Sequence, residues 1–156
     1  MAGVSHAAGP RIEGVSITLL RVIADERGCV MHMLRADSAA FEGFREVYFS
    51  VIRAGAVKAW KRHRLMVQNF AVPVGAIRLV VHDDRPASTS RGVTQEIHTG
   101  ASLDQYALVR IPPMVWYGFQ GVAAVDSLIA NCASLPHDPG EVDRLVENAE
   151  DIPYVW

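Results

Sequence analysis

Short apolar runs separated by turn signals are the feature that most constrains the fold of this chain. The runs recur about every 8–12 residues, and the segments between them are rich in glycine, proline and aspartate. They cover Gly14–Ile23, Cys29–Leu34, Val47–Ile52, Val57–His63, Gln68–Val74, Ala76–His82, Gln95–His98, Tyr106–Ile111, Val115–Phe119 and Ser127–Cys132. Short strands at this spacing predict an all-β sandwich or barrel. With 156 residues, we expect one domain over residues 11–156, after a flexible arm at residues 1–10.

Helical periodicity is scarce and predicts no more than a short C-terminal helical segment. Within Gly140–Glu150, the side chains of Val142, Leu145 and Val146 fall on one side of an acidic helix or turn. The chain contains no internal repeat, low-complexity tract or linker that would divide the domain.

Charge and cysteine content exclude several classes of protein. Fifteen Lys and Arg residues against 17 Asp and Glu give a net charge of −2, which argues against a broad nucleic-acid-binding surface. The longest uncharged stretch, Ile111–Val125, contains two prolines and is shorter than the roughly 20 residues of a membrane helix. Cys29 and Cys132 form neither a disulfide framework nor a zinc motif, so the cytoplasm is the expected compartment.

The segment between Gly55 and Gly75 has the spacing of the first cupin motif, G-x5-H-x-H-x4-E-x6-G. Both glycines and the second histidine, His63, are in place. Lys61 replaces the first histidine, and Gln68 replaces the glutamate.

The second cupin motif, P-x-G-x2-H-x3-N, falls on Pro112–Gly121, where Tyr117 replaces the ligand histidine. Cupin metals are bound by neutral imidazoles and a carboxylate, and one of the four ligand positions keeps such a donor. We therefore predict no bound metal, which disfavours a metal-dependent cupin enzyme. The interpretation that remains is a pocket into which Lys61, His63, Gln68 and Tyr117 point.

This set of side chains suits proton abstraction next to a carbonyl group. A neutral His63 is a competent general base. Lys61 could lose its own proton, or stabilise an enolate oxygen as a cation. Tyr117 could donate a proton. The alternative is a polar barrel mouth with satisfied hydrogen bonds and no chemistry.

Strand alternation predicts which side chains share this face. Val57, Ala59, Lys61 and His63 are expected to point inward, at the mouth of a barrel. The opposite, outer or interface face is expected to carry Lys58, Trp60, Arg62 and Arg64.

Several short segments resemble the dTDP-4-dehydrorhamnose 3,5-epimerase superfamily of nucleotide-sugar epimerases and isomerases. They are Asp25–Gly28, Glu46–Ser50, Lys58–Trp60, Asp84-Arg85 with Ser88, Ile111–Pro113, Val115-Trp116, Gly118–Gln120, Asn131, His137–Pro139 and Ile152–Trp156. The resemblance runs from about residue 11 to the C-terminus. It implies a cupin-type jelly roll (double-stranded β-helix), no cofactor, and a homodimer whose interface could include Ala56–Arg64 or the N-terminal strand.

The chain departs from the family at its catalytic positions. Lys61 stands where the resemblance places the histidine base, and Tyr117 replaces a second histidine. The general-acid tyrosine of the 3,5-epimerases falls near Asn131. His63 matches the second histidine of the H-x-H pair in related 3,4-ketoisomerases.

The resemblance implies an epimerase or ketoisomerase acting on a nucleotide-linked 4-keto-6-deoxyhexose. His63 or Lys61 would remove the proton next to the ketone, and Lys61 or Tyr117 would steady the enolate and return a proton. The candidate diphosphate ligands are Lys58, Arg27 and Arg62; the candidate stacking residues are Trp60, Tyr48 and Trp116; and Gln68 and Asn131 complete the predicted substrate contacts. The alternative is a non-enzymatic cupin that binds a nucleotide sugar or a related acidic metabolite.

Overall fold

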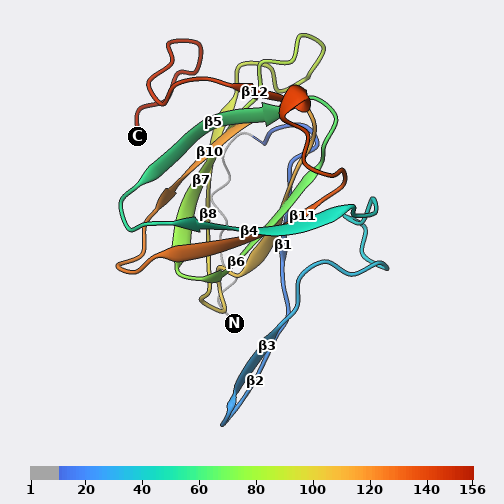
Figure 1. Cartoon of the computed structure of the whole chain (residues 1–156), viewed down its shortest axis with the longest axis vertical. Coiled ribbons are helices and arrows are strands. Elements are labelled where there is room, and N and C mark those ends of the chain that lie inside the picture. The colour runs from blue at the N-terminus through green and yellow to red at the C-terminus, as the bar shows by residue number, and fades with distance from the viewer. Residues whose placement is uncertain (1–10) are drawn as a thin grey trace.

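The computed structural model describes residues 11–156, so the flexible arm predicted at residues 1–10 lies outside the described residues. Two five-stranded antiparallel sheets face one another, and a separate two-stranded hairpin projects from one end (Figure 1). This arrangement confirms the all-β prediction. No helix in the described range is long and apolar enough to cross a membrane.

The first sheet has the strand order β1-β9-β6-β11-β4. Its strands are β1 (Ser16–Leu19), β9 (Ala107–Ile111), β6 (Gln68–Val74), β11 (Ser127–Ala133) and β4 (Glu46–Ile52). The second sheet has the order β12-β5-β10-β7-β8. Its strands are β12 (Val142–Arg144), β5 (Val57–His63), β10 (Trp116–Gly121), β7 (Ala76–His82) and β8 (Thr94–Gly100), and the hairpin is β2 (Val22–Asp25) with β3 (Gly28–Met31).

The main core fills the space between the two sheets. Val72 and Ile129 reach into it from the first sheet, and Leu79 and Val81 from the second; all four are buried. Burying one face of each sheet is what the alternating apolar pattern of the strands requires. A cavity lined by both sheets lies within this space, and the candidate site is built around it.

The predicted C-terminal helical segment is wrong. A single 3-10 turn covers Pro139–Glu141, and the chain then continues as strand β12, which pairs with β5. Leu145 extends this pairing, because its backbone N–H and C=O exchange hydrogen bonds with Trp60. A helix of about ten residues is marginal in water, whereas the edge of β5 offers unpaired backbone groups that a strand satisfies.

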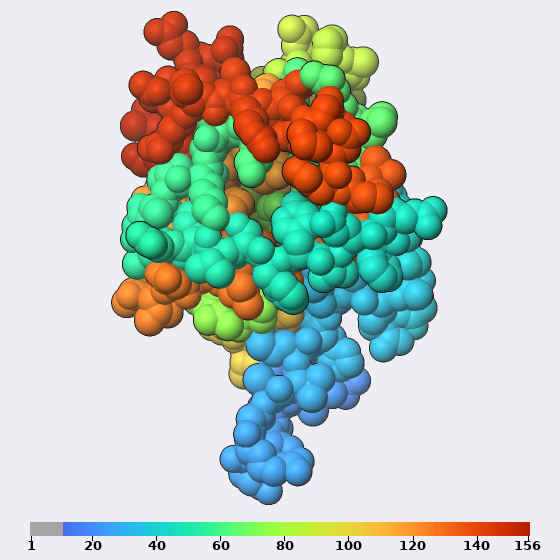
Figure 2. Space-filling view, viewed as in Figure 1, coloured from blue at the N-terminus to red at the C-terminus, as the bar shows by residue number. Residues whose placement is uncertain are grey.

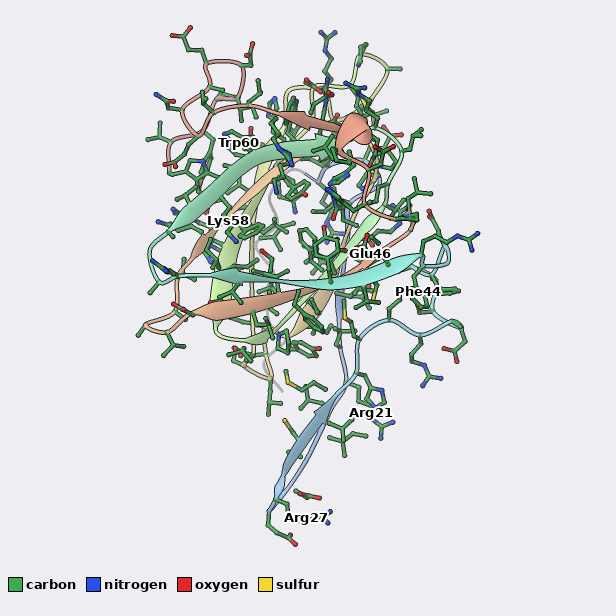
Figure 3. The ribbon with its side chains drawn as sticks, in the orientation of Figure 1. Arg21, Arg27, Phe44, Glu46, Lys58 and Trp60 are labelled. Carbon is green, nitrogen blue, oxygen red and sulfur yellow. The ribbon has the colours of Figure 1, made fainter. Side chains whose placement is uncertain are left out.

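A register shift in β5 overturns part of the predicted alternation. Tyr117 pairs with Lys61 and Phe119 with Lys58, so two steps along β10 match three steps along β5. The extra residue is a β-bulge, and it turns Lys58 to the same face as Lys61. Figure 3 shows Lys58 pointing from β5 toward β4, with Trp60 on the other side of the strand. Lys58 therefore does not lie on the outer face.

The outer face of β5 is covered rather than free. Trp60 is 1% exposed and packs with Ile152, Tyr154 and Trp156 of the C-terminal segment. Its indole N–H donates to the carbonyl of Glu147. The C-terminal segment thus holds β5 from behind, while the opposite face of the strand lines the site.

Candidate active site

A cavity of about 170 Å³ lies between the two sheets. Its lining residues are Tyr48, Ser50, Lys58, Lys61, Phe70, Tyr117, Phe119, Ile129 and Asn131. They come from β4, β6 and β11 of one sheet and from β5 and β10 of the other. Figure 2 shows a recess between the surfaces of β4 and β5, in which residues of later strands are visible.

Cations dominate the charge around this cavity. Lys58 and Lys61 are its charged lining residues, and Arg144 lies opposite Lys61 across the β12–β5 pair and shares its face. Burial lowers the pKa of the Lys61 ammonium, and the positive charges of Arg144 and Lys58 lower it further. Lys58 also donates to the Ser50 hydroxyl at 3.2 Å and to the carbonyl of Val51 at 2.6 Å. An anionic substrate would find compensating charge here.

A network of neutral polar side chains forms the cavity wall beside these cations. Gln68 donates from Nε2 to the Tyr117 hydroxyl at 3.1 Å. Asn131 donates from Nδ2 to Gln68 Oε1 at 2.5 Å and to the Tyr48 hydroxyl at 2.9 Å. The side-chain oxygen of Asn131, Oδ1, accepts a hydrogen bond from the backbone N–H of Asn69, and this contact fixes the orientation of the Asn131 side-chain amide. Tyr117 is thus held in place by groups from the opposite sheet.

His63 and Glu141 form a buried pair behind this wall. The His63 Nδ1 atom lies 2.5 Å from Glu141 Oε1, and the ring is 5% exposed. The other Glu141 oxygen accepts from the backbone N–H of Leu65 at 3.0 Å and of Met66 at 3.4 Å. Burial lowers the pKa of His63, against the opposing effect of Glu141. For Glu141, the hydrogen bonds from Leu65 and His63 outweigh burial and lower the pKa.

His63 does not line the cavity itself, and it is connected to the cavity by its contact with Tyr117. The His63 Nε2 atom lies 3.3 Å from the Tyr117 hydroxyl oxygen, and the two rings are nearly parallel. Tyr117 and Lys61 line the cavity, whereas His63 and Gln68 lie behind it. The three predicted catalytic residues are therefore brought together, with His63 one layer deeper than the sequence pattern indicated.

Four of the predicted substrate-binding residues lie elsewhere, and the first of them, Trp60, is buried behind β5. Arg62 stacks on Trp116 at 4.6 Å and pairs with Asp84 and Asp143, on the side of the sheet away from the cavity. Trp116 also donates its indole N–H to Asp84. Arg27 lies at the tip of the β2–β3 hairpin, far from the cavity of its own chain (Figure 3).

Ser50, Glu141 and Arg144 belong to the site and were not found from the sequence. Glu141 and Arg144 lie in the segment predicted as an acidic helix or turn, in which charged side chains are expected to face the solvent. Residues 11–156 contain no group of three or more His, Cys, Asp or Glu side chains that could hold a metal ion.

Comparison with known proteins identifies relatives over most of the chain. No family model matches it. A probable low-salt glycan biosynthesis epimerase, Agl13 of Haloferax volcanii, is 32% identical over 147 residues, which are 93% of this chain and 90% of that protein. The crystal structure of a dTDP sugar isomerase from Desulfovibrio desulfuricans G20 is 47% identical, with a TM-score of 0.90 over 93% of this chain and 92% of that one. This chain belongs to the dTDP-4-dehydrorhamnose 3,5-epimerase-like family of nucleotide-sugar epimerases and isomerases.

A further sequence relative and a further solved structure also match over most of the chain. The spore coat polysaccharide biosynthesis protein SpsL of Bacillus subtilis is 26% identical over 93% of this chain and 96% of that protein. A dTDP-4-dehydrorhamnose 3,5-epimerase from Bacillus anthracis is 15% identical, covers 92% of this chain and 85% of that one, and has a TM-score of 0.81. The cupin-like fold and the isomerase class implied by the resemblance are thereby confirmed.

Proposed function

We propose that this chain removes a proton next to the ketone of a nucleotide-linked 4-keto-6-deoxyhexose, and so epimerises the sugar or moves its ketone. The observation that supports this is the cavity itself, which is lined by both Lys61 and Tyr117, a pair of residues opposite one another on β5 and β10. The ketone of such a substrate acidifies its neighbouring C–H bond, so no cofactor is required. The enolate that forms is negatively charged, and Lys61 as a cation stabilises it.

Lys58 is our candidate for the diphosphate. Its ammonium is anchored to Ser50 and to the backbone of β4, and both Lys58 and Ser50 line the cavity. Asn131 and Tyr48 offer polar groups to the sugar, while Phe70 and Phe119 supply an apolar wall. The relative from Desulfovibrio desulfuricans is a dTDP sugar isomerase, which makes thymidine diphosphate the first nucleotide to test.

The proposed function is tested by proton exchange in D2O. The purified protein is incubated with dTDP-, CDP-, GDP- and UDP-4-keto-6-deoxyhexoses, and the sugar protons at C3 and C5 are followed by NMR. Loss of one signal identifies the carbon from which the proton is removed. Thermal stabilisation by the same compounds without any exchange would instead favour a non-enzymatic binder.

We further propose that two copies of the chain pair in solution. Val47, Phe49 and Val51 lie on the outward face of β4, at the edge of its sheet, and are 46%, 64% and 53% exposed. Such an apolar edge requires a cover. The β2–β3 hairpin also projects from its own chain, and pairing would allow Arg27 to approach the partner's site.

The two free cysteines favour a reducing cytoplasm as the compartment.

A further inference from the structure

We infer that Tyr117 exchanges the proton with the substrate, and that His63, held by Glu141, accepts and returns that proton from behind it. This inference rests on the proposed proton-abstraction function and assigns its acid–base group. It makes Tyr117 the catalytic residue, and His63 and Glu141 the residues that act through it.

The order of the three side chains supports this assignment. Glu141, His63 and Tyr117 form one line of contacts, at 2.5 Å from Glu141 to His63 and 3.3 Å from His63 to Tyr117. Tyr117 is the member of this line that reaches the cavity. For His63 to touch a substrate carbon, the Tyr117 ring would have to leave its position, where Gln68 and Phe70 hold it.

The hydrogen bonds also fix where the protons lie. Glu141 is ionised and accepts from two backbone N–H groups through Oε2, so its Oε1 accepts from His63 Nδ1–H. The neutral imidazole therefore presents an unprotonated Nε2 to Tyr117. The Tyr117 oxygen already accepts from Gln68, whose orientation is set by Asn131, so its one hydrogen is directed to His63 Nε2.

The reaction then consists of two linked proton transfers, from the substrate to Tyr117 and from Tyr117 to His63. The substrate C–H bond breaks, its electron pair moves toward the ketone oxygen, and its proton goes to the Tyr117 oxygen. The original Tyr117 proton moves to His63 Nε2, and the imidazolium that results is stabilised by the Glu141 carboxylate. The reverse sequence returns a proton to the sugar. Burial raises the pKa of Tyr117, so a hydroxyl without an acceptor behind it would be a poor base.

Replacement of Tyr117 by phenylalanine distinguishes the relay from direct action of His63. Y117F leaves His63 and Glu141 intact but removes the atom that joins them to the cavity. We expect proton exchange with the substrate to fall at least about 100-fold, as is typical when an acid–base group is lost. The control is Y154F, because Tyr154 lies outside the cavity, bonded to Glu96 on β8. Exchange by Y117F within about threefold of wild type would overturn the relay.

The pH profile tests the role of Glu141 beyond its structural contacts. The groups that face His63 are Glu141, Tyr117, Lys61 and His137. The relay requires neutral His63, so the rate should fall on the acid side as the ring is protonated. Glu141 raises the pKa of His63, so E141Q should move this acid limb to lower pH while it lowers the maximal rate. If the acid limb of E141Q lies at the same pH as that of wild type, the role assigned to Glu141 is contradicted.

A measurement on the unaltered protein guards against variants that fail to fold. Nitrogen-15 NMR of the histidine rings reports which nitrogen carries the proton. We expect His63 at neutral pH to be protonated at Nδ1, with Nε2 as a hydrogen-bond acceptor; the opposite tautomer would overturn the relay. If the wild-type protein exchanges no sugar proton, both the proposed function and the relay are refuted. If the wild type exchanges and Y117F does too, the relay alone fails.

Discussion

At the scale of single residues, the exchange of a histidine for Lys61 changes what the site can do. An imidazole can be a neutral base near pH 7, whereas an ammonium at the same place is first of all a positive charge. The surroundings of Lys61 are cationic on two sides, through Lys58 and Arg144. Its charge is therefore available to an anionic intermediate rather than neutralised by a carboxylate of the protein.

This role of Lys61 predicts an alkaline limb in the pH profile. Because burial, Arg144 and Lys58 lower its pKa below the usual 10.5, wild-type activity should decline at a pH below 10.5 as the ammonium is lost. K61R keeps a charge that does not titrate in this range, so its residual activity should show no such decline. K61M should lose about 100-fold or more at neutral pH, and its activity should approach that of wild type at a pH where the wild-type ammonium is also lost. A K61R profile with the wild-type alkaline limb would exclude Lys61 as its source.

At the scale of elements, the loop that joins β7 to β8 is organised by one buried carboxylate. Asp83 has no exposed surface and accepts hydrogen bonds from Arg85, Ser88 and Ser90. Although burial acts to raise it, these bonds hold the pKa of Asp83 well below its usual value. The contribution of Asp83 to stability is therefore present above the pKa of the unfolded chain, near 4, and is lost as the pH falls through the lower folded pKa.

We expect D83N to lower the free energy of unfolding by about 2–4 kcal/mol at pH 7. The matched control is D37N, since Asp37 pairs with Arg35 at the same two-residue spacing but with both side chains exposed. D37N should change stability by less than about 0.5 kcal/mol. Urea unfolding at pH 7 and pH 3 provides the measurement, and the gap between D83N and wild type should narrow at pH 3. Equal effects of the two variants would contradict this account.

The strands could be predicted because their signal is local. The limits of β5, β6 and β7 coincide with the apolar runs Val57–His63, Gln68–Val74 and Ala76–His82, each bounded by a turn signal. The pairing of His63 with Glu141 could not be predicted, since 78 residues separate them and no local pattern marks the glutamate. The inward turn of Lys58 was missed for another reason, because strict alternation assumes a strand without a bulge.

At the scale of the whole molecule, exposed apolar side chains are unevenly distributed over the surface. Apolar side chains gather on the outer face of β4, and the β2–β3 hairpin extends away from both sheets (Figure 1). A hairpin of two strands has little stability of its own in water. We therefore expect the hairpin and the β4 face to be covered in the assembled enzyme.

Phe49→Asp tests this expectation. A carboxylate in the centre of the β4 face would be buried without a partner on association, so F49D should shift the protein from dimer to monomer in analytical ultracentrifugation. The control is V155D, because Val155 is 92% exposed on the C-terminal segment behind β5. A wild-type protein that sediments as a monomer at micromolar concentration would refute the proposed dimer.

The bulge in β5 makes the site sensitive to the length of the chain as well as to its composition. Deleting one residue between Lys58 and Lys61 would leave every side chain of the cavity in the sequence, yet would turn Lys58 to the opposite face of the strand. In a library of single-residue deletions, this short stretch should tolerate losses far less than the exposed turn at residues 122–126. During divergence within the family, insertions and deletions here would act as changes of specificity, because each one exchanges the charges that a substrate meets.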